Sequence, residues 1–298
     1  MNPLFDFEFT TIHDELINTF RQQQAKSPMG TQALDAFKKI IKHYYANKRR
    51  PFAWRDVITP YRVVVSEIML QQTQTDRVAQ KFEPFIAEFP TFQALAQAPF
   101  HDIVRMWKGL GYNRRALALQ KIAQRVTTDH SGNLPPVPNI LETFPGIGKA
   151  TARSITTFAF NVPTTFIETN IRTVFIYFFL KDRLDVHDKE LEPLVAATVD
   201  QLNPREWYYA LMDYGVMLKK TVGNVSRLSA HYTKQSKFEG SDRQIRGMIL
   251  QALLDHQALT ETALVATLQK EENRVRKMVS DLSAEGIIKN RHGLLELG

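Results

Sequence analysis

The sequence predicts an all-α fold over most of its length, followed by a small tail that mixes helices and strands. Apolar residues recur at helical spacing through residues 58–222, and prolines mark short breaks between the segments. This region has no convincing series of alternating apolar and polar residues, which would indicate half-buried strands. The 298 residues are enough for two or three domains.

The first part of the chain predicts two amphipathic helices, over residues 11–25 and 33–47, with a linker at 26–30. The apolar face of the second helix comprises Leu34, Phe37, Ile40, Ile41, Tyr44 and Tyr45. The longest apolar run, residues 173–180, is far too short to span a bilayer and predicts a buried helix.

The most informative segment, residues 144–152, predicts a helix, a tight turn and a second helix. Pro145 ends the first helix because it lacks an N–H, and Gly146 and Gly148 allow a tight turn. The helix that begins at Lys149 offers unpaired N–H groups and a positive dipole end, which suit a phosphate. An ordinary helix-turn-helix corner is the alternative interpretation of this segment by itself.

Two glutamates are candidates for acid–base chemistry. Glu67 lies in the nearly apolar run 63–70, where desolvation should raise its pKa and make it a general acid near neutrality. Glu168 precedes an apolar helix, where N–H groups and the helix dipole should keep it ionised. The alternatives are a polar residue paired with an arginine for Glu67 and a helix cap for Glu168.

The tail begins after a short polar hinge at residues 236–241, where Ser241 with Gln244 predicts a helix start. Further helices are expected from about Thr260 and from about Glu271, and residues 287–297 predict two strands around a turn at His292-Gly293. Three helices followed by a β-wing resemble a winged helix. Its candidate DNA contacts are Arg274, Lys277 and Arg291, and a protein-binding or purely structural module is the alternative.

Composition favours a polyanionic partner, because the formal net charge is +7 and the isoelectric point is about 9.5. The sequence contains no cysteine, which excludes disulfides and thiol-ligated metals, and its eight histidines show no metal-ligand spacing. We expect no cofactor and no metal. The first twenty residues show no secretory signal, so we expect a cytoplasmic protein that acts at the bacterial nucleoid. We also expect a monomer.

Three motifs upstream of the hairpin give a family resemblance: Pro51-Phe-Ala-Trp-Arg55, Val65-Ser-Glu-Ile-Met-Leu-Gln-Gln-Thr-Gln74 and Trp107-Lys-Gly-Leu-Gly-Tyr-Asn-Arg-Arg-Ala116. With the hairpin, this set resembles the helix-hairpin-helix (HhH-GPD) DNA glycosylases, and within them the MutY-type A/G-specific adenine glycosylases. The resemblance covers roughly residues 33–220. It implies a two-lobed helical glycosylase domain over 1–235, with an N-terminal extension over 1–31, and a separate winged-helix-like domain over 236–298.

The resemblance also implies roles for individual residues. Glu67 matches the glutamate that protonates the adenine ring, Glu168 occupies the position of the catalytic aspartate, and Tyr112 matches a tyrosine in the site. Gln72 matches a glutamine that wedges into the duplex. The implied DNA-binding residues are Trp54, Arg55, Gln71, Gln72, Gly146, Gly148, Lys149, Ala150 and Thr151.

The chain departs from the family in four ways. Glu168 replaces an aspartate, and Ala150 stands where bifunctional relatives carry a nucleophilic lysine, which makes a lyase step unexpected. The four-cysteine iron–sulfur motif is missing from residues 219–235, so no such cluster can be ligated there. The tail does not resemble the Nudix-like domain with which MutY-type enzymes read 8-oxoguanine.

We therefore expect a monofunctional DNA glycosylase of base excision repair that acts on double-stranded DNA containing a lesion or mispair. Such an enzyme must flip the base out of the stack before it hydrolyses the N-glycosidic bond. Adenine is the expected base, because purine loss gains from ring protonation by Glu67. The alternatives are a glycosylase for uracil, mismatched thymine or a damaged purine, and a catalytically impaired DNA-binding homologue.

Overall fold

The computed structural model describes residues 3–234 and 236–298, and it divides into two compact units. The first unit combines residues 1–51 with 149–233, and the second combines 52–148 with 234–298. The predicted all-α fold is confirmed. In the described ranges, no helix is long and apolar enough to cross a membrane.

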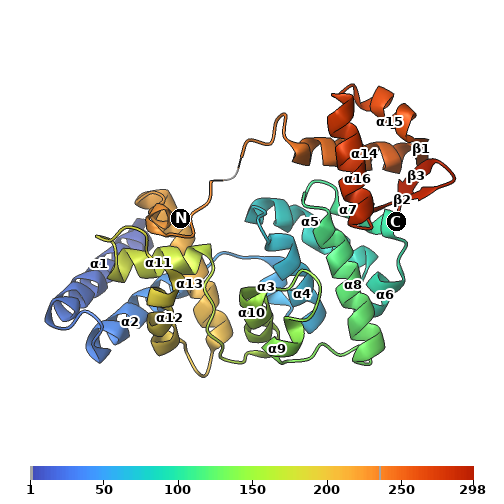
Figure 1. Ribbon diagram of the computed structural model, residues 1–298. Helices are drawn as coiled ribbons and strands as arrows, with labels where there is room; N and C mark the ends of the chain where they lie inside the picture. The colour runs from blue at the N-terminus through green and yellow to red at the C-terminus, as the bar shows by residue number, and fades with distance from the viewer. Residues whose placement is uncertain (1–2, 235) are drawn as a thin grey trace. The chain divides into compact units, whose positions relative to one another are not determined.

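The first unit is entirely helical (Figure 1). Its elements are α1 (Pro3–Lys26), α2 (Thr31–Lys48), α10 (Lys149–Phe160), α11 (Thr169–Phe179), α12 (Asp188–Thr198), α13 (Pro204–Thr221) and the 3-10 helix η1 (Val225–Leu228). Phe37 of α2 is fully buried, and its ring contacts Phe175 and Phe178 of α11 and Trp207 of α13. Phe20 of α1 packs edge-to-face on Phe178, so the N-terminal extension forms part of this core.

The second unit contains ten helices and a small sheet among its described residues. The helices of its first segment are α3 (Ala53–Asp56), α4 (Pro60–Leu70), α5 (Thr75–Glu88), α6 (Phe92–Gln97), α7 (Phe100–Trp107), α8 (Arg114–Asp129) and α9 (Pro138–Leu141). Thr59 caps α4 by accepting a hydrogen bond from the N–H of Arg62, and Pro60 begins the helix. The core of this segment contains Phe82, Phe85 and Trp107.

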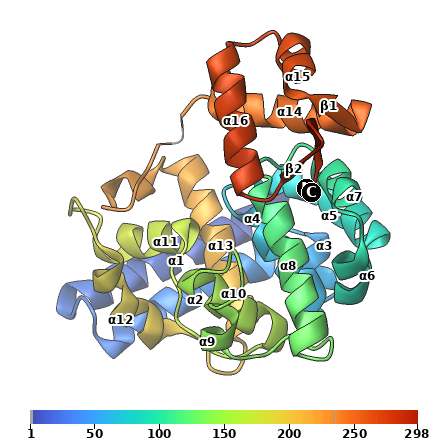
Figure 2. The same ribbon diagram turned by 45° about the vertical axis from the view of Figure 1, so that its right-hand side comes forward.

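The tail folds as expected for a winged helix, with one additional strand (Figure 2). Its elements are α14 (Asp242–His256), β1 (Ala258–Thr260), α15 (Glu261–Leu268), α16 (Glu272–Ala284), β2 (Ile288–Arg291) and β3 (Leu294–Leu297). The antiparallel sheet has the order β1-β3-β2, and positive φ angles at His292 (53°) and Gly293 (84°) form the predicted turn. The tail is grouped with residues 52–148, and its separation at residue 236 as an independent domain stays a prediction.

One detail of the predicted start of α14 is wrong. The helix begins at Asp242, but the Ser241 side chain makes no capping bond and donates instead to the carbonyl of Phe238 (2.6 Å). Gln244 accepts from the N–H of Gly240 at 2.7 Å. The hinge is therefore closed by local hydrogen bonds, and the Ser241 hydroxyl is bound to the carbonyl of Phe238 instead of capping the helix.

Gly215 on α13 lies against the first turn of α11. A Cβ atom at this position would lie 2.5 Å from the carbonyl oxygen and 2.9 Å from the Cα atom of Asn170. Because both obstacles are main-chain atoms, they cannot move away as a flexible side chain could.

We expect Gly215→Ala to lower the free energy of unfolding by about 1–3 kcal/mol, since the helices must separate to admit a methyl group. Urea unfolding measures this change. Gly247 on α14 is the matched control, because a Cβ there meets nothing within 4 Å. Gly247→Ala should stabilise the protein through helix propensity, by about 1 kcal/mol at most. Equal stability of the wild type and Gly215→Ala would contradict the close approach.

Candidate active site and nucleic-acid interface

Glu67 lies on α4, a helix that is otherwise almost completely buried. Val65, Ser66, Ile68 and Met69 are inaccessible or nearly so, whereas Glu67 is half-buried. Glu67, the charged residue in the last turn of this apolar helix, is therefore partly accessible at the edge of the core. Its predicted elevated pKa stays a prediction.

Arg115 is the residue that holds the end of α4 in place. One terminal nitrogen of its buried guanidinium donates to the carbonyls of Ile68 (2.8 Å), Met69 (2.9 Å) and Gln71 (2.6 Å). The other donates to Thr73 Oγ1 (2.9 Å) and to the carbonyls of Leu110 (2.9 Å) and Gly111 (3.1 Å). These bonds satisfy the last carbonyls of the helix, which have no partner within it. They also join the turn after α4 to the turn before α8.

Burial lowers the pKa of the Arg115 guanidinium to about 10, so the group remains a cation at neutral pH. Arg115 belongs to the motif over residues 107–116, but no role was predicted for it. A signal was present: Arg115 shares helical spacing with Leu119, Ile122 and Val126, all buried on α8. A charged residue on an apolar face indicates a buried group with fixed partners.

The two turns joined by Arg115 carry Gln72 and Tyr112 in left-handed conformations. Gln72 has a φ of 54° and Tyr112 has a φ of 46°. Residues other than glycine, asparagine and aspartate rarely adopt this backbone conformation. The Tyr112 ring centroid lies 5.6 Å from the Arg115 guanidinium carbon. Strained backbone of this kind persists only where the surroundings hold it, and it is enriched at functional sites.

Gln71 connects this cluster to the glycine-rich turn. Its side-chain Nε2 donates to the carbonyl of Gly146 at 3.1 Å. Gly146 has a φ of 76°, and a Cβ there would meet the Cβ of Ala118 at 3.0 Å, so both backbone conformation and packing favour glycine. Within the second unit, the structure thus brings together the end of α4, Tyr112 and the turn. Their role as one site stays a prediction.

The hairpin presents an exposed main chain. Gly148 is exposed and has open space where a Cβ would stand, and Lys149 and Ala150, which follow it, are also exposed. The predicted helix from Lys149 is observed as α10, with Ala152, Ile155 and Phe158 buried on one face. The first N–H groups of α10 are therefore available to a phosphate, which is the physical basis of the predicted contacts at Gly148 to Thr151.

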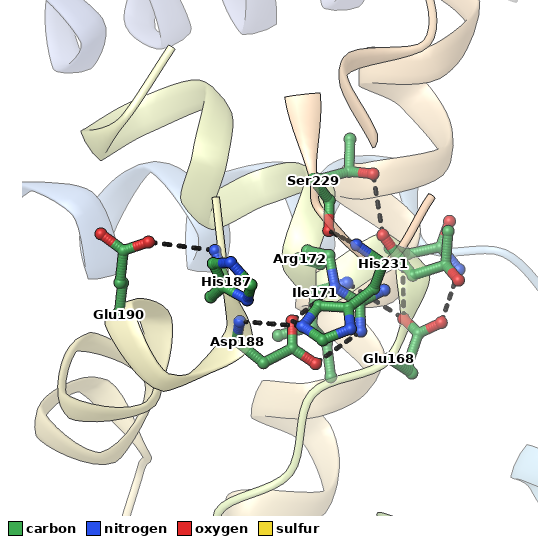
Figure 3. A network of polar contacts seen from close by, with 11 residues as sticks. Glu168, Ile171, Arg172, His187, Asp188, Glu190, Ser229 and His231 are labelled. Atoms are coloured by element: carbon green, nitrogen blue, oxygen red, sulfur yellow. Dashed lines mark hydrogen bonds and ion pairs between the residues drawn. The ribbon is translucent and has the colours of Figure 1, made fainter. Parts of the chain in front are cut away.

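Glu168 is the N-cap residue of α11 in the first unit (Figure 3). Its Oε1 accepts from the N–H groups of Asn170 (2.9 Å) and Ile171 (3.0 Å), and its Oε2 accepts from the Asn170 amide at 3.3 Å. Burial raises the pKa of the Glu168 carboxyl above its usual value, although these donors and Arg172 act in the opposite direction. The carboxylate is both a helix cap and a group with perturbed acidity, so capping does not exclude chemistry.

Arg172, one turn after Glu168, is fixed by a bidentate bond to Asp188, with nitrogen–oxygen distances of 2.6 and 2.8 Å. The main-chain N–H of Asp188 donates to Nε2 of His231 at 3.3 Å (Figure 3). The segment around His231 is also tied by main-chain bonds from Val186 to Leu228 (2.9 Å) and from Ala230 to Val186 (3.1 Å). Specific contacts therefore hold residues 228–231, which lie in the stretch where the family's cysteine motif is missing.

The residues present in that stretch do not fit an iron–sulfur cluster, because it contains no thiolate ligand. Within residues 3–234 and 236–298, no group of three or more histidine, aspartate or glutamate side chains could hold a metal ion.

Two predicted DNA contacts lie in the hydrophobic core or beside it. Trp54 is only 5% exposed, stacks on Phe52 with ring centroids 4.5 Å apart, and meets Phe82 edge-to-face. The Arg55 guanidinium lies 5.2 Å from the Phe52 ring centroid. This environment gives Trp54 a packing role, and contact of either residue with DNA stays a prediction.

The three candidate contacts of the tail differ in their surroundings. Arg274 pairs with Asp242 (2.5 Å), and Arg291 pairs with Glu296 (2.7 Å). Lys277 is exposed on α16. Since exposed ion pairs are worth about 1 kcal/mol or less, a phosphate could compete for both arginines, and their DNA contacts stay predictions.

The helical units, the glycine turn before α10 and the Glu168-capped helix define a class of helix-hairpin-helix repair protein. Residues 65–196 match the family described as HhH-GPD superfamily base excision DNA repair protein. The family resemblance predicted from the motifs is thereby confirmed.

Several curated relatives carry the name adenine DNA glycosylase. The protein of Buchnera aphidicola subsp. Baizongia pistaciae is 31% identical over 186 residues, covering 61% of this chain and 52% of the relative. That of Mycobacterium tuberculosis H37Rv is 37% identical over 132 residues, covering 44% and 43%. That of Mycolicibacterium smegmatis is 28% identical over 236 residues, covering 71% and 78%. The chain spans about half the length of the first two relatives.

Solved structures share the fold. A thermostable thymine-DNA glycosylase superposes with a TM-score of 0.56 at 24% identity, covering 62% of this chain and 86% of that chain. An endonuclease III in a non-covalent DNA complex superposes with a TM-score of 0.52 at 16% identity, covering 66% and 85%. At these identities the likeness establishes the fold alone.

Proposed function

We propose that this protein is a monofunctional DNA glycosylase that removes adenine from a mispair in double-stranded DNA. The observation that carries the proposal is the similarity to relatives named adenine DNA glycosylase. The family match over residues 65–196 includes Glu67, the hairpin and Glu168. The net charge of +7 supports a polyanionic partner. Such a partner is held here by main-chain N–H groups at the start of α10 and by basic side chains.

The proposed chemistry divides between two carboxyl groups. Glu67 donates a proton to the flipped purine, which makes the base a better leaving group. Glu168 acts as a carboxylate, because its two main-chain N–H donors and Arg172 favour the charged form against the effect of burial. In this form it stabilises the positive charge developing on the sugar and orients a water molecule. Glutamate is longer than aspartate by one methylene group. The bonds to the first N–H groups of α11 therefore determine where the carboxylate of this longer side chain lies.

A panel of duplexes tests the proposal. Each duplex carries one defined mispair or lesion: adenine opposite guanine, 8-oxoguanine or cytosine, uracil or thymine opposite guanine, and a fully paired control. Protein is added, alkali follows, and strand breaks are scored. Cleavage confined to adenine-containing mispairs supports the proposal, while cleavage of another duplex identifies a different substrate base.

A second candidate is excision of a different base, such as uracil, mismatched thymine or a damaged purine. The winged-helix topology of residues 242–297 favours keeping it, because this tail differs from the Nudix-like module that reads 8-oxoguanine in MutY-type enzymes. A protein that binds DNA without excision is the remaining alternative, and no strand break on any duplex would identify it.

We also propose that the protein has no lyase step, because Ala150 offers no amine. Strand breaks should require alkali or heat, and borohydride should trap no protein–DNA adduct in proportion to turnover. Ala150→Lys is the positive control, since it supplies an amine at the start of α10 and should yield an adduct. Efficient trapping by the wild type, through Lys149 or another lysine, would contradict the prediction.

A further inference from the structure

The tail reaches the predicted site of the second unit through one side chain. Arg243, in the first turn of α14, donates from one terminal nitrogen to the phenol oxygen of Tyr112 at 3.1 Å. Its other terminal nitrogen donates to the carbonyl (2.6 Å) and hydroxyl (3.2 Å) of Ser236. The hinge thus holds the guanidinium in place, and one of its donors is directed at the phenol oxygen of Tyr112.

Tyr112 is held by cations from two elements. The guanidinium carbon of Arg115 lies 5.6 Å from its ring centroid and that of Arg243 lies 5.7 Å away, both within the range of cation–π attraction. Because a guanidinium has no lone pair to offer, the phenol oxygen is the acceptor of the bond from Arg243. This bond fixes the rotation of a ring whose backbone is already in a strained, left-handed conformation.

Tyr112 follows a residue that is bound to Arg115, so the bond from Arg243 to Tyr112 is connected to the helix that carries Glu67. The carbonyl of Gly111, the preceding residue, accepts from the same Arg115 nitrogen that binds Thr73, and Arg115 also holds the last carbonyls of α4 behind Glu67. A shift of Tyr112 is therefore transmitted through Arg115 to the end of α4.

We propose that Arg243 is a positioning residue for base excision, through which the winged-helix tail orients Tyr112. The proposal rests on the proposed glycosylase function, because excision is its main readout. It assigns the tail a role that is independent of any phosphate contact by Arg274, Lys277 or Arg291. The connection is direct, because the same guanidinium binds Ser236 of the hinge and the hydroxyl of Tyr112.

A double-mutant cycle with Tyr112→Phe tests the proposal in the full-length protein, on the duplex that the panel identifies as substrate. We expect Arg243→Ala to lower the single-turnover excision rate about tenfold, the effect of losing one charge-assisted hydrogen bond, with duplex affinity little changed. In Tyr112→Phe, which lacks the acceptor, Arg243→Ala should cause little further loss. Arg243→Lys should restore part of the rate, because it keeps one donor.

A control variant separates the role of Arg243 from the general effect of removing an arginine from the tail. Arg276→Ala removes a tail arginine whose partners are Glu261 and Glu272. It should excise at the wild-type rate. If Arg243 only anchored the tail, its effect would be the same in the presence and absence of the Tyr112 hydroxyl, and this result would overturn the proposal.

An NMR measurement without DNA tests the Arg243–Tyr112 contact even if the protein shows no excision. In protein labelled with 13C at tyrosine Cζ, Tyr112→Phe identifies the Tyr112 resonance, and Arg243→Ala should shift it while Arg276→Ala should not. An unmoved resonance would refute the Arg243–Tyr112 contact. Absence of excision by the wild type, with the resonance shifted, would refute the proposed function and the positioning role but leave the contact established.

Discussion

Glu67→Gln and Glu168→Gln are each expected to lower the single-turnover excision rate by about 10²–10⁴-fold, the usual cost of losing a positioned acid or base. Glutamine matches glutamate in shape and keeps an oxygen that accepts the N–H bonds of Asn170 and Ile171, so α11 stays capped. Affinity for the duplex should change little. Single-turnover excision assays together with equilibrium binding to the same duplex measure both quantities.

Exposed glutamates provide the controls. Glu88→Gln, in the second unit, and Glu192→Gln, in the first, remove a charge of the same kind and should excise at the wild-type rate. Glu168→Asp restores the family's residue and should retain activity. Wild-type rates in both Glu67→Gln and Glu168→Gln would leave Glu168 with a capping role alone and would falsify the two-carboxylate mechanism.

Replacing Arg115 by methionine should cause a large loss of stability. The variant leaves the carbonyls of Ile68, Met69 and Leu110 without their donor, and each buried unsatisfied acceptor costs about 1–3 kcal/mol. Since some of these groups will regain water, we expect a loss of about 3–4 kcal/mol in the free energy of unfolding. Urea unfolding monitored by circular dichroism measures it.

The neighbouring arginine is the matched control for this prediction. Arg114 is exposed on the same turn of α8, and Arg114→Met should change stability by about 0.5 kcal/mol or less. Arg115→Lys should fall between the two, because an ammonium group has three donors and lacks the planar fork. If Arg115→Met and Arg114→Met unfold alike, the hydrogen bonds of Arg115 do not hold the end of α4.

Local chemistry explains why the hairpin and the Glu168 cap could be predicted. A proline without an N–H, two glycines and an exposed helix start act within a few residues of one another, so their consequence is visible in the sequence. Glu168 was expected at the start of a helix and is its N-cap, with both bonds made within three residues. The His292-Gly293 turn was predictable for the same reason.

Features that depend on packing could not be predicted in this way. Trp54 matched a DNA-contacting position of the family, but its burial against Phe52 and Phe82 is decided by how α3 meets α5. The strand β1, of three residues, has too short a pattern to be recognised, and it forms because β3 offers an open edge.

The sequence by itself determined the helical class, the glycine turn, the two carboxylates and the impossibility of a thiolate cluster in residues 219–235. Each of these follows from residue identity or from spacing within one helix. Only the tertiary structure decided that Arg115 reaches carbonyls 46 and 47 positions away and that Arg243 reaches Tyr112 across 131 positions. The physical reason is that a guanidinium has several donors but no preference for partners near in sequence, so packing of distant helices selects the acceptors.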